Sequence, residues 1–194
     1  VVFVDVEKDT YNIDIEDLKL KMNDDIKAII PVHLFGMCSN MDAVKELCSN
    51  ISIIEDAACA AGATYHEQMA GSMADVGCFS FHPRKSITTG EGGMLTTNND
   101  QIAAQLRKWR NHGSYIHPNE LIDGAKPYTM PDVLDVGYNY RLTDIQACIG
   151  VEQLKKMEGF INERDAMADA YDAAFEVIDW INIPHRPKGY GHSW

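Results

Sequence analysis

Short, almost continuously apolar runs alternate with helix-like segments from residue 1 to about residue 98, and this alternation constrains the fold more than any other feature of the chain. Such runs indicate strands that are buried on both faces, since a sheet with one wet face alternates apolar and polar residues. Strands separated by helices join most simply into a parallel sheet. The sequence therefore predicts an α/β fold with three layers, in which a mostly parallel sheet is flanked by helices.

The apolar runs and the capping residues predict where the elements lie. We expect strands at residues 1–6, 26–30, 51–54, 76–81 and 93–97. We expect helices after Asp14, over residues 41–47 and after Asn99, because Asp and Asn are favoured at the N-cap. Thr143, followed by Gln three residues later, has the form of a capping box and predicts one long amphipathic helix from Thr143 towards Ile178.

These elements suggest two parts. We place residues 1–141 in a large domain, and residues 142–194 in a long connecting helix that leads to a small, mostly missing domain. The chain opens inside an apolar run and closes where another strand is expected, so we expect it to be an internal piece of a longer protein. The irregular stretch 113–139 contains Pro118, Pro127 and Pro131, and loops of this length are typically functional or packed against a partner.

The charge balance excludes some classes of protein. Seventeen Lys and Arg stand against 29 Asp and Glu, which gives a net charge of −12 and argues against a general nucleic-acid-binding surface. No apolar run approaches the roughly 20 residues that span a bilayer. The five cysteines are odd in number and widely spaced, so they indicate neither a disulfide framework nor a zinc knuckle. We expect reduced thiols and a cytoplasmic protein.

Three polar side chains follow predicted strands. Asp56 ends one strand, at the sheet edge where open α/β folds bind ligands, although a helix-capping Asp fits the same position. Ser80 and Lys85 follow another strand, and glycines at 90–93 allow close approach of the backbone to a ligand. A carboxylate, a hydroxyl and an amine would suit an aldehyde cofactor with a pyridine ring and a phosphate. A lysine in a polar segment is also typical of a solvated surface, and the residues alone leave both interpretations open.

Seven segments, in this order, resemble the sugar aminotransferases of the DegT/DnrJ/EryC1/StrS family, and together they are far more specific than any one of them. They are residues 5–13 (DVEKDTYNI), 31–36 (PVHLFG), 54–58 (IEDAA), 78–81 (CFSF), 85–94 (KSITTGEGGM), 110–113 (RNHG) and 137–144 (GYNYRLTD). The resemblance covers essentially the whole chain. It implies a fold-type I enzyme that uses pyridoxal 5'-phosphate and works as a homodimer with shared active sites.

The resemblance also implies roles for individual residues. Lys85 would bond to the cofactor aldehyde and then move the proton between the substrate carbon and the cofactor. Asp56 would pair with the pyridinium nitrogen. Ser80 would bind the cofactor phosphate, and Asn139 would reach the same phosphate from the neighbouring subunit. A turn-forming Ser and a helix-preceding Asn are the structural alternatives for the last two positions.

Two positions bear on the activity within the family. Cys59 stands where many relatives have a Gln near the ring hydroxyl of the cofactor, and a thiol is a weak hydrogen-bonding group. Lys85 stands where the deoxysugar dehydratases of this fold have His. A lysine at this position favours amine transfer. The implied reaction moves an amino group from glutamate to a keto sugar nucleotide, with Arg141, His112 and Gly113 as candidates for contacts with the donor or the sugar. Transfer to a cyclitol or another cyclic ketone, and a non-catalytic relative that binds sugar nucleotides, remain alternatives.

Overall fold

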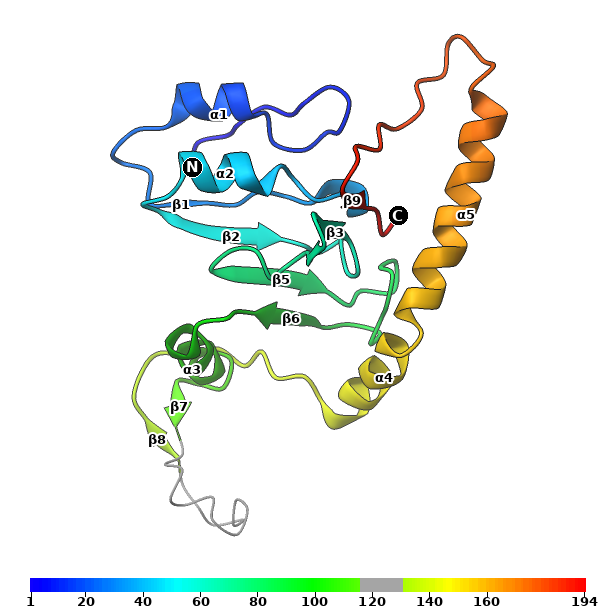
Figure 1. The fold of residues 1–194 in the computed structure, drawn as a ribbon. Coiled ribbons are helices and arrows are strands. Elements are labelled where there is room, and N and C mark those ends of the chain that lie inside the picture. The colour runs from blue at the N-terminus through cyan, green and yellow to red at the C-terminus, as the bar shows by residue number, and fades with distance from the viewer. Residues whose placement is uncertain (116–130) are drawn as a thin grey trace. The chain divides into compact units, whose positions relative to one another are not determined.

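The computed structural model describes residues 1–115 and 131–194 (Figure 1). Two of the three prolines of the long predicted loop, Pro118 and Pro127, lie outside the described residues. The chain forms two compact units, residues 1–97 with 144–194 and residues 98–143. No helix of the described part is long and apolar enough to cross a membrane.

A four-stranded sheet forms the centre of the larger unit, and its order is β1-β2-β5-β6. The β1–β2 and β2–β5 pairs are parallel and the β5–β6 pair is antiparallel. The predicted fold class, α/β with a mostly parallel sheet, is therefore confirmed. The bounds of these strands are β1 Ala28–Ile29, β2 Ser52–Asp56, β5 Val76–Ser80 and β6 Gly93–Thr96.

Helices α1 and α2 lie next to each other, on the β1 side of this sheet (Figure 1). Leu18 of α1 and Val44 of α2 are buried in one cluster with Ile29 and Ile53 of the first two strands. Their removal from water supplies the main attraction between the layers. The helices of the larger unit are α1 Ile15–Lys21, α2 Met41–Leu47, α4 Asp144–Leu154 and α5 Met157–Phe175, with a 3-10 turn at Leu34–Gly36.

Two smaller sheets complete the described chain. The larger unit has a three-stranded antiparallel sheet of β4 Gln68–Met69, β3 Thr64–Tyr65 and β9 Tyr190–Gly191. The smaller unit contains α3 Asp100–Trp109 and the strand pair β7 Ser114–Tyr115 and β8 Asp132–Val133.

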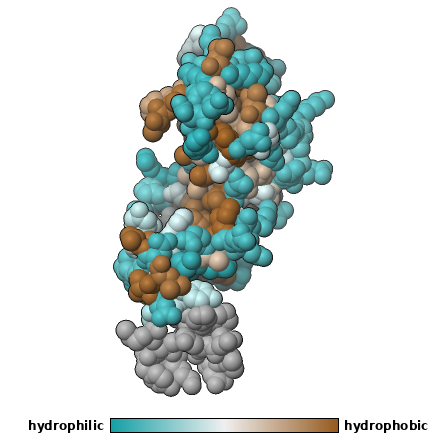
Figure 2. Space-filling view, turned by 90° about the vertical axis from the view of Figure 1, so that its left-hand side faces the viewer, coloured by the Kyte–Doolittle hydropathy of each residue, from teal (hydrophilic) through white to brown (hydrophobic). Residues whose placement is uncertain are grey.

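Apolar side chains also reach the surface, and Figure 2 shows brown patches between hydrophilic regions on the face that it displays. Within the larger unit, Ile30 and Leu95 are 59% and 48% exposed, and both lie next to strands of the main sheet or within them. An exposed apolar surface beside a sheet is typical of a surface that another protein segment or subunit covers.

The element predictions were partly wrong at the two ends. Residues 1–6 form no strand, and only an isolated bridge joins Val6 to Ile13. An apolar run becomes a strand only where a neighbouring strand can take its backbone hydrogen bonds. The predicted single helix is two helices, α4 and α5, separated at Lys155 and Lys156. The domain boundary that we placed after residue 141 stays a prediction.

Candidate functional site

A cavity of about 660 Å³ lies beyond the carboxyl ends of β2 and β5 in the larger unit. It collects side chains from the turn after β2, from the end of β5 and from the segment that follows β5. Its lining residues are Phe35, Cys59, Ser80, His82, Arg84, Lys85, Ser86, Glu91 and Trp194. Open α/β sheets place their ligands at this edge, because neighbouring strands end there and their loops diverge.

Lys85 reaches into this cavity from a tight turn. The backbone N–H of Lys85 donates to the His82 carbonyl at 2.9 Å, and the His82 N–H donates to the Ser80 hydroxyl oxygen at 3.3 Å. The Lys85 side chain donates from Nζ to the Cys59 Sγ at 3.0 Å. The structure thus brings together three of the predicted site residues, Cys59, Ser80 and Lys85, although they come from different turns and strands.

Asp56 stands at the same sheet edge but is not among the lining residues. As the last residue of β2 it pairs with Cys78 of β5. Because side chains alternate along a strand, Asp56 and Cys78 share one sheet face with Ser80, two residues further on. Burial raises the pKa of the Cys78 thiol, and the charge of Asp56 raises it further. The Asp56 carboxylate accepts one hydrogen bond, from the Ala58 N–H at 3.1 Å.

The glycine-bearing segment after Lys85 folds back beside the cavity. The Thr89 N–H and the Thr88 hydroxyl both donate to the carbonyl of Phe81, just beyond β5, at 3.1 and 2.9 Å. Gln146 of α4 donates to the Glu91 carbonyl at 2.8 Å. Gly90 has a φ of +82°, a left-handed conformation that favours glycine. The segment is therefore anchored to β5 and to α4.

Asn139, the remaining predicted site residue, belongs to the smaller unit. Its side-chain oxygen accepts a hydrogen bond from the Arg141 Nε at 3.0 Å, and its backbone bridges to Asn111. His112, with a left-handed φ of 60°, and Gly113 lie in the same unit. The roles suggested for these residues stay predictions.

The sequence analysis gave no role to several residues of this region. Phe35 lines the cavity, is 64% exposed and has a left-handed φ of 55°, which is uncommon for an aromatic residue. Arg84 adds a second cation beside Lys85. Glu55 is completely buried on the sheet face opposite Asp56. The only sequence signal for Glu55 was its position as an acidic residue within an apolar strand. A carboxylate buried there needs several hydrogen-bond partners.

Comparison with known proteins decides the family. Residues 1–194 match the DegT/DnrJ/EryC1/StrS aminotransferase family. The chain belongs to this family. The chain spans about half the length of the curated relatives that it matches. GDP-perosamine synthase of Caulobacter vibrioides is 41% identical over 187 residues, which are 95% of this chain and 47% of that protein.

Solved structures of other aminotransferases have the same fold. The aminotransferase PseC of Helicobacter pylori, involved in the biosynthesis of pseudoaminic acid, superposes with a TM-score of 0.89 at 30% identity, over 99% of this chain and 50% of PseC. The putative sugar aminotransferase Spr1654 of Streptococcus pneumoniae, in its PMP form, gives a TM-score of 0.88 at 27% identity, over 99% of this chain and 53% of that protein. Spr1654 is also similar in its PLP form.

Proposed function

We propose that this chain is part of a pyridoxal-phosphate-dependent enzyme that transfers an amino group from glutamate to a keto sugar nucleotide, with a 4-keto-6-deoxyhexose as the acceptor. Family membership and the similarity to a GDP-perosamine synthase support this proposal. The observation that supports it most directly is the position of the Lys85 amine, in a cavity with Ser80 and Cys59 at the carboxyl edge of the sheet.

The residues of the cavity fit the chemical groups of the cofactor. Lys85 supplies an amine for the aldehyde. The Ser80 hydroxyl and the cationic Arg84 suit a phosphate, because hydrogen bonds to a charged partner are stronger than neutral ones. Asp56, at the same edge, offers a carboxylate for the ring nitrogen. The cavity of about 660 Å³ lies in the size range of small-molecule sites.

Each residue then has a definite task. When bound, the cofactor supplies a ring that withdraws electrons from the reacting carbon. Asp56 holds a proton on the ring nitrogen, since a nearby carboxylate favours the charged form, and each pKa unit of this coupling is worth about 1.4 kcal/mol. Lys85 would hold the cofactor through Nζ and would move a proton at the substrate carbon as a general base and acid.

The proposed assembly extends beyond one chain. Asn139 would contribute to the phosphate site of the neighbouring subunit in a homodimer. All five cysteines are free, which fits a reducing compartment, and we place the protein in the cytoplasm.

The test uses the purified full-length protein. We expect visible absorption from bound cofactor, and borohydride followed by peptide mapping should fix the cofactor to Lys85. Lys85→Ala should abolish both the attachment and turnover with glutamate. Lys155→Ala is the matched control, because Lys155 is an exposed lysine of the α4 end that pairs with Glu152. Retention of attachment and turnover in Lys85→Ala would refute the assignment.

The acceptor is tested separately with a panel of keto sugar nucleotides and cyclic ketones such as keto-cyclitols, in the presence of glutamate. Turnover of a 4-keto-6-deoxyhexose nucleotide above the other compounds is the expected result. Preference for a keto-cyclitol would instead favour the alternative acceptor class, and cofactor binding without any turnover would favour a binding protein.

A further inference from the structure

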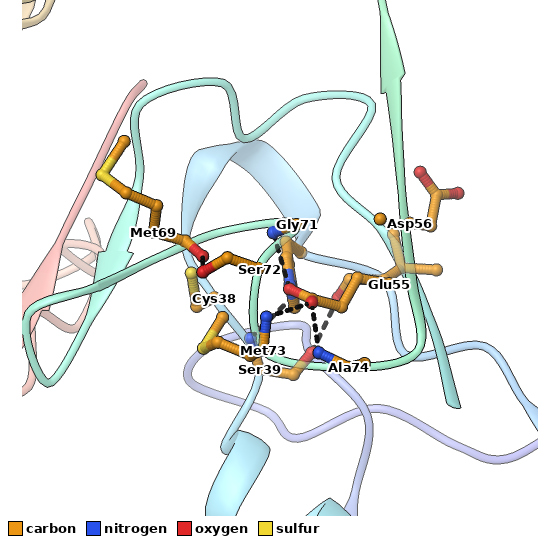
Figure 3. A network of polar contacts seen from close by, with 12 residues as sticks. Cys38, Ser39, Glu55, Asp56, Met69, Gly71, Ser72, Met73 and Ala74 are labelled. Carbon is orange, nitrogen blue, oxygen red and sulfur yellow. Dashed lines mark hydrogen bonds and ion pairs between the residues drawn. The ribbon is translucent and has the colours of Figure 1, made fainter. Parts of the chain in front are cut away.

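Glu55 is the most completely hydrogen-bonded acid among the described residues of the larger unit. Its side chain is fully buried, and its Oε1 accepts hydrogen bonds from the Met73 N–H at 2.7 Å and the Ala74 N–H at 2.8 Å. Its Oε2 accepts from the Gly71 N–H at 2.7 Å (Figure 3). The same oxygen lies 2.9 Å from the His33 Nε2. Three separate segments of the chain therefore meet at this carboxylate.

His33 is oriented so that it donates to Glu55. Its Nδ1 accepts a hydrogen bond from the Ser39 N–H at 3.1 Å, so the ring proton resides on Nε2 and points at Glu55. Burial raises the pKa of the Glu55 carboxyl, but the hydrogen bonds from His33, Gly71 and Met73 outweigh burial and hold the pKa below its usual value. Every partner of the carboxylate is thus a donor, and the group is ionised.

The segment that carries His33 also flanks Asp56, the next residue of β2. On one side, the Asp56 N–H donates to the Pro31 carbonyl and the His33 N–H donates to the Asp56 carbonyl, both at 2.9 Å. On the other side, Asp56 is paired with Cys78 of β5. Figure 3 shows the Asp56 carboxylate pointing away from the network around Glu55. Consecutive side chains of a strand point to opposite faces of the sheet, so fixing the Glu55 side chain on one face also fixes the direction of the Asp56 side chain on the other.

Stability alone does not require such a network. Replacing a buried ionic network by well-packed apolar side chains is often neutral or stabilising, because desolvating the charges is expensive. Apolar packing, however, has no directional preference, whereas four hydrogen bonds to one carboxylate set both its position and its orientation. The hydrogen bonds around Glu55 are therefore more suited to fixing the position of the β2 end than to stabilising the fold.

We propose that Glu55, held by His33 and by the backbone of residues 71–74, is a positioning residue that aims the Asp56 carboxylate at the ring nitrogen of the cofactor. This inference rests on the proposed function. Glu55 itself would touch neither cofactor nor substrate, and its effect would pass through the last residue of β2.

The test replaces Glu55 by Gln in the full-length protein. A Gln amide would set its NH2 against backbone N–H groups or against the His33 Nε2 proton, so the strand end must shift. We expect the dissociation constant for pyridoxal phosphate to rise about tenfold, the change that corresponds to one pKa unit of lost coupling at Asp56. We also expect the pH midpoint of the bound cofactor's visible band to move.

Two controls separate positioning from loss of stability. Asp75→Asn makes the same kind of change at the other end of β2, where Asp75 accepts from the Ile53 N–H at 2.9 Å. Val44→Ala weakens the buried core at α2 without touching the strand end. Val44→Ala should lower the unfolding midpoint, whereas Asp75→Asn keeps an accepting oxygen and should change it little. Both controls should leave the pH midpoint of the cofactor band unchanged.

A second variant keeps the test decisive if Glu55→Gln does not fold. In His33→Asn the side-chain oxygen can still accept from the Ser39 N–H, but the shorter side chain cannot reach Glu55. It should weaken cofactor binding in the same direction, by less than Glu55→Gln.

The outcomes separate the two proposals. If the unmodified protein shows no cofactor band and no borohydride attachment, the proposed function fails and this inference fails with it. If the unmodified protein binds the cofactor, and the Glu55 and His33 variants bind it with unchanged affinity and pH midpoint or behave like the controls, the positioning role alone is refuted.

Discussion

The Cys59 thiol contacts the Lys85 amine at 3.0 Å, and this pair is the residue-scale feature that most distinguishes the cavity. The resemblance to the family implies a Gln at this position in many members. A thiol donates and accepts hydrogen bonds weakly, whereas an amide does both well. In the proposed enzyme, the cavity would therefore offer the cofactor one strong polar group fewer than the pockets of those relatives do.

Cys59→Gln is expected to tighten cofactor binding. A typical hydrogen bond contributes about 1 kcal/mol net, which corresponds to about a fivefold lower dissociation constant. Absorbance titration of the cofactor-free protein measures this constant. Cys59→Ala serves as the control, since it removes the thiol and adds no hydrogen bond. Equal affinity of the Gln and Ala variants would show that this position does not face a polar group of the cofactor.

At the scale of single elements, α1 shows how a capping residue places a helix. The Asp14 carboxylate accepts from the Glu16 N–H at 2.8 Å and the Asp17 N–H at 3.2 Å, which satisfies two donors that the first turn leaves free. The helix begins at Ile15, as the sequence predicted, and buries Leu18 against the sheet. Local chemistry therefore fixes the start of this element.

Asp14→Ala is expected to lower the free energy of unfolding by about 1 kcal/mol, the usual cost of losing an N-cap. Asp14→Asn keeps a side-chain oxygen at the cap and should stay close to the unmodified protein. Urea denaturation followed by circular dichroism gives both values. Equal losses in the two variants would mean that the charge, and not the cap, is what matters.

Two glycines in different elements should respond to alanine in opposite directions. A methyl group at Gly77 of β5 would collide with the Gly71 backbone, which the Glu55 network holds in place. A methyl group at Gly159 of α5 meets nothing within 4 Å. We expect Gly77→Ala to lower the free energy of unfolding by about 1–3 kcal/mol through overpacking. Gly159→Ala should raise it by about 0.5–1 kcal/mol, because alanine loses less entropy in a helix. Thermal unfolding of both variants checks the signs.

Tertiary packing decided the elements that local patterns misplaced. The predicted helix from Thr143 to Ile178 is interrupted, and after the break Met157 and Phe160 of α5 pack against a cluster of Ala61, Phe81 and Ile87. The apolar spacing of the sequence is compatible with one straight helix or with two. The choice between one helix and two depends on where the apolar cluster that α5 covers lies in the folded chain.

At the scale of the whole molecule, the buried Glu55 network should make the larger unit sensitive to acid. The hydrogen bonds to Glu55 hold its folded pKa below the ordinary value of 4.5, so its contribution to stability is fully present above that value and is lost as the pH falls through the folded pKa. Glu55→Gln lacks this term. The variant should therefore be less stable at pH 7, and the gap should narrow as the pH is lowered.

Urea midpoints measured from pH 7 down to pH 3, for the unmodified protein and Glu55→Gln, test this expectation. Asp75→Asn again provides the comparison, because Asp75 is exposed and its carboxylate accepts one hydrogen bond, from the Ile53 N–H near the start of β2. A gap between the unmodified protein and Glu55→Gln that is independent of pH would contradict an ionised Glu55 in the folded state.

The sequence by itself determined the α/β class, the helices that begin after Asp14 and Asn99, and the family, because these depend on local apolar periodicity, on caps and on motifs that are contiguous in the chain. Only the tertiary structure decided which side chains share a cavity. Cys59, Ser80 and Lys85 meet because two parallel strands end at one edge, and Glu55 finds His33 and the 71–74 backbone because the sheet brings distant segments together. Such contacts depend on strand order and register, which are settled by the packing of the whole sheet.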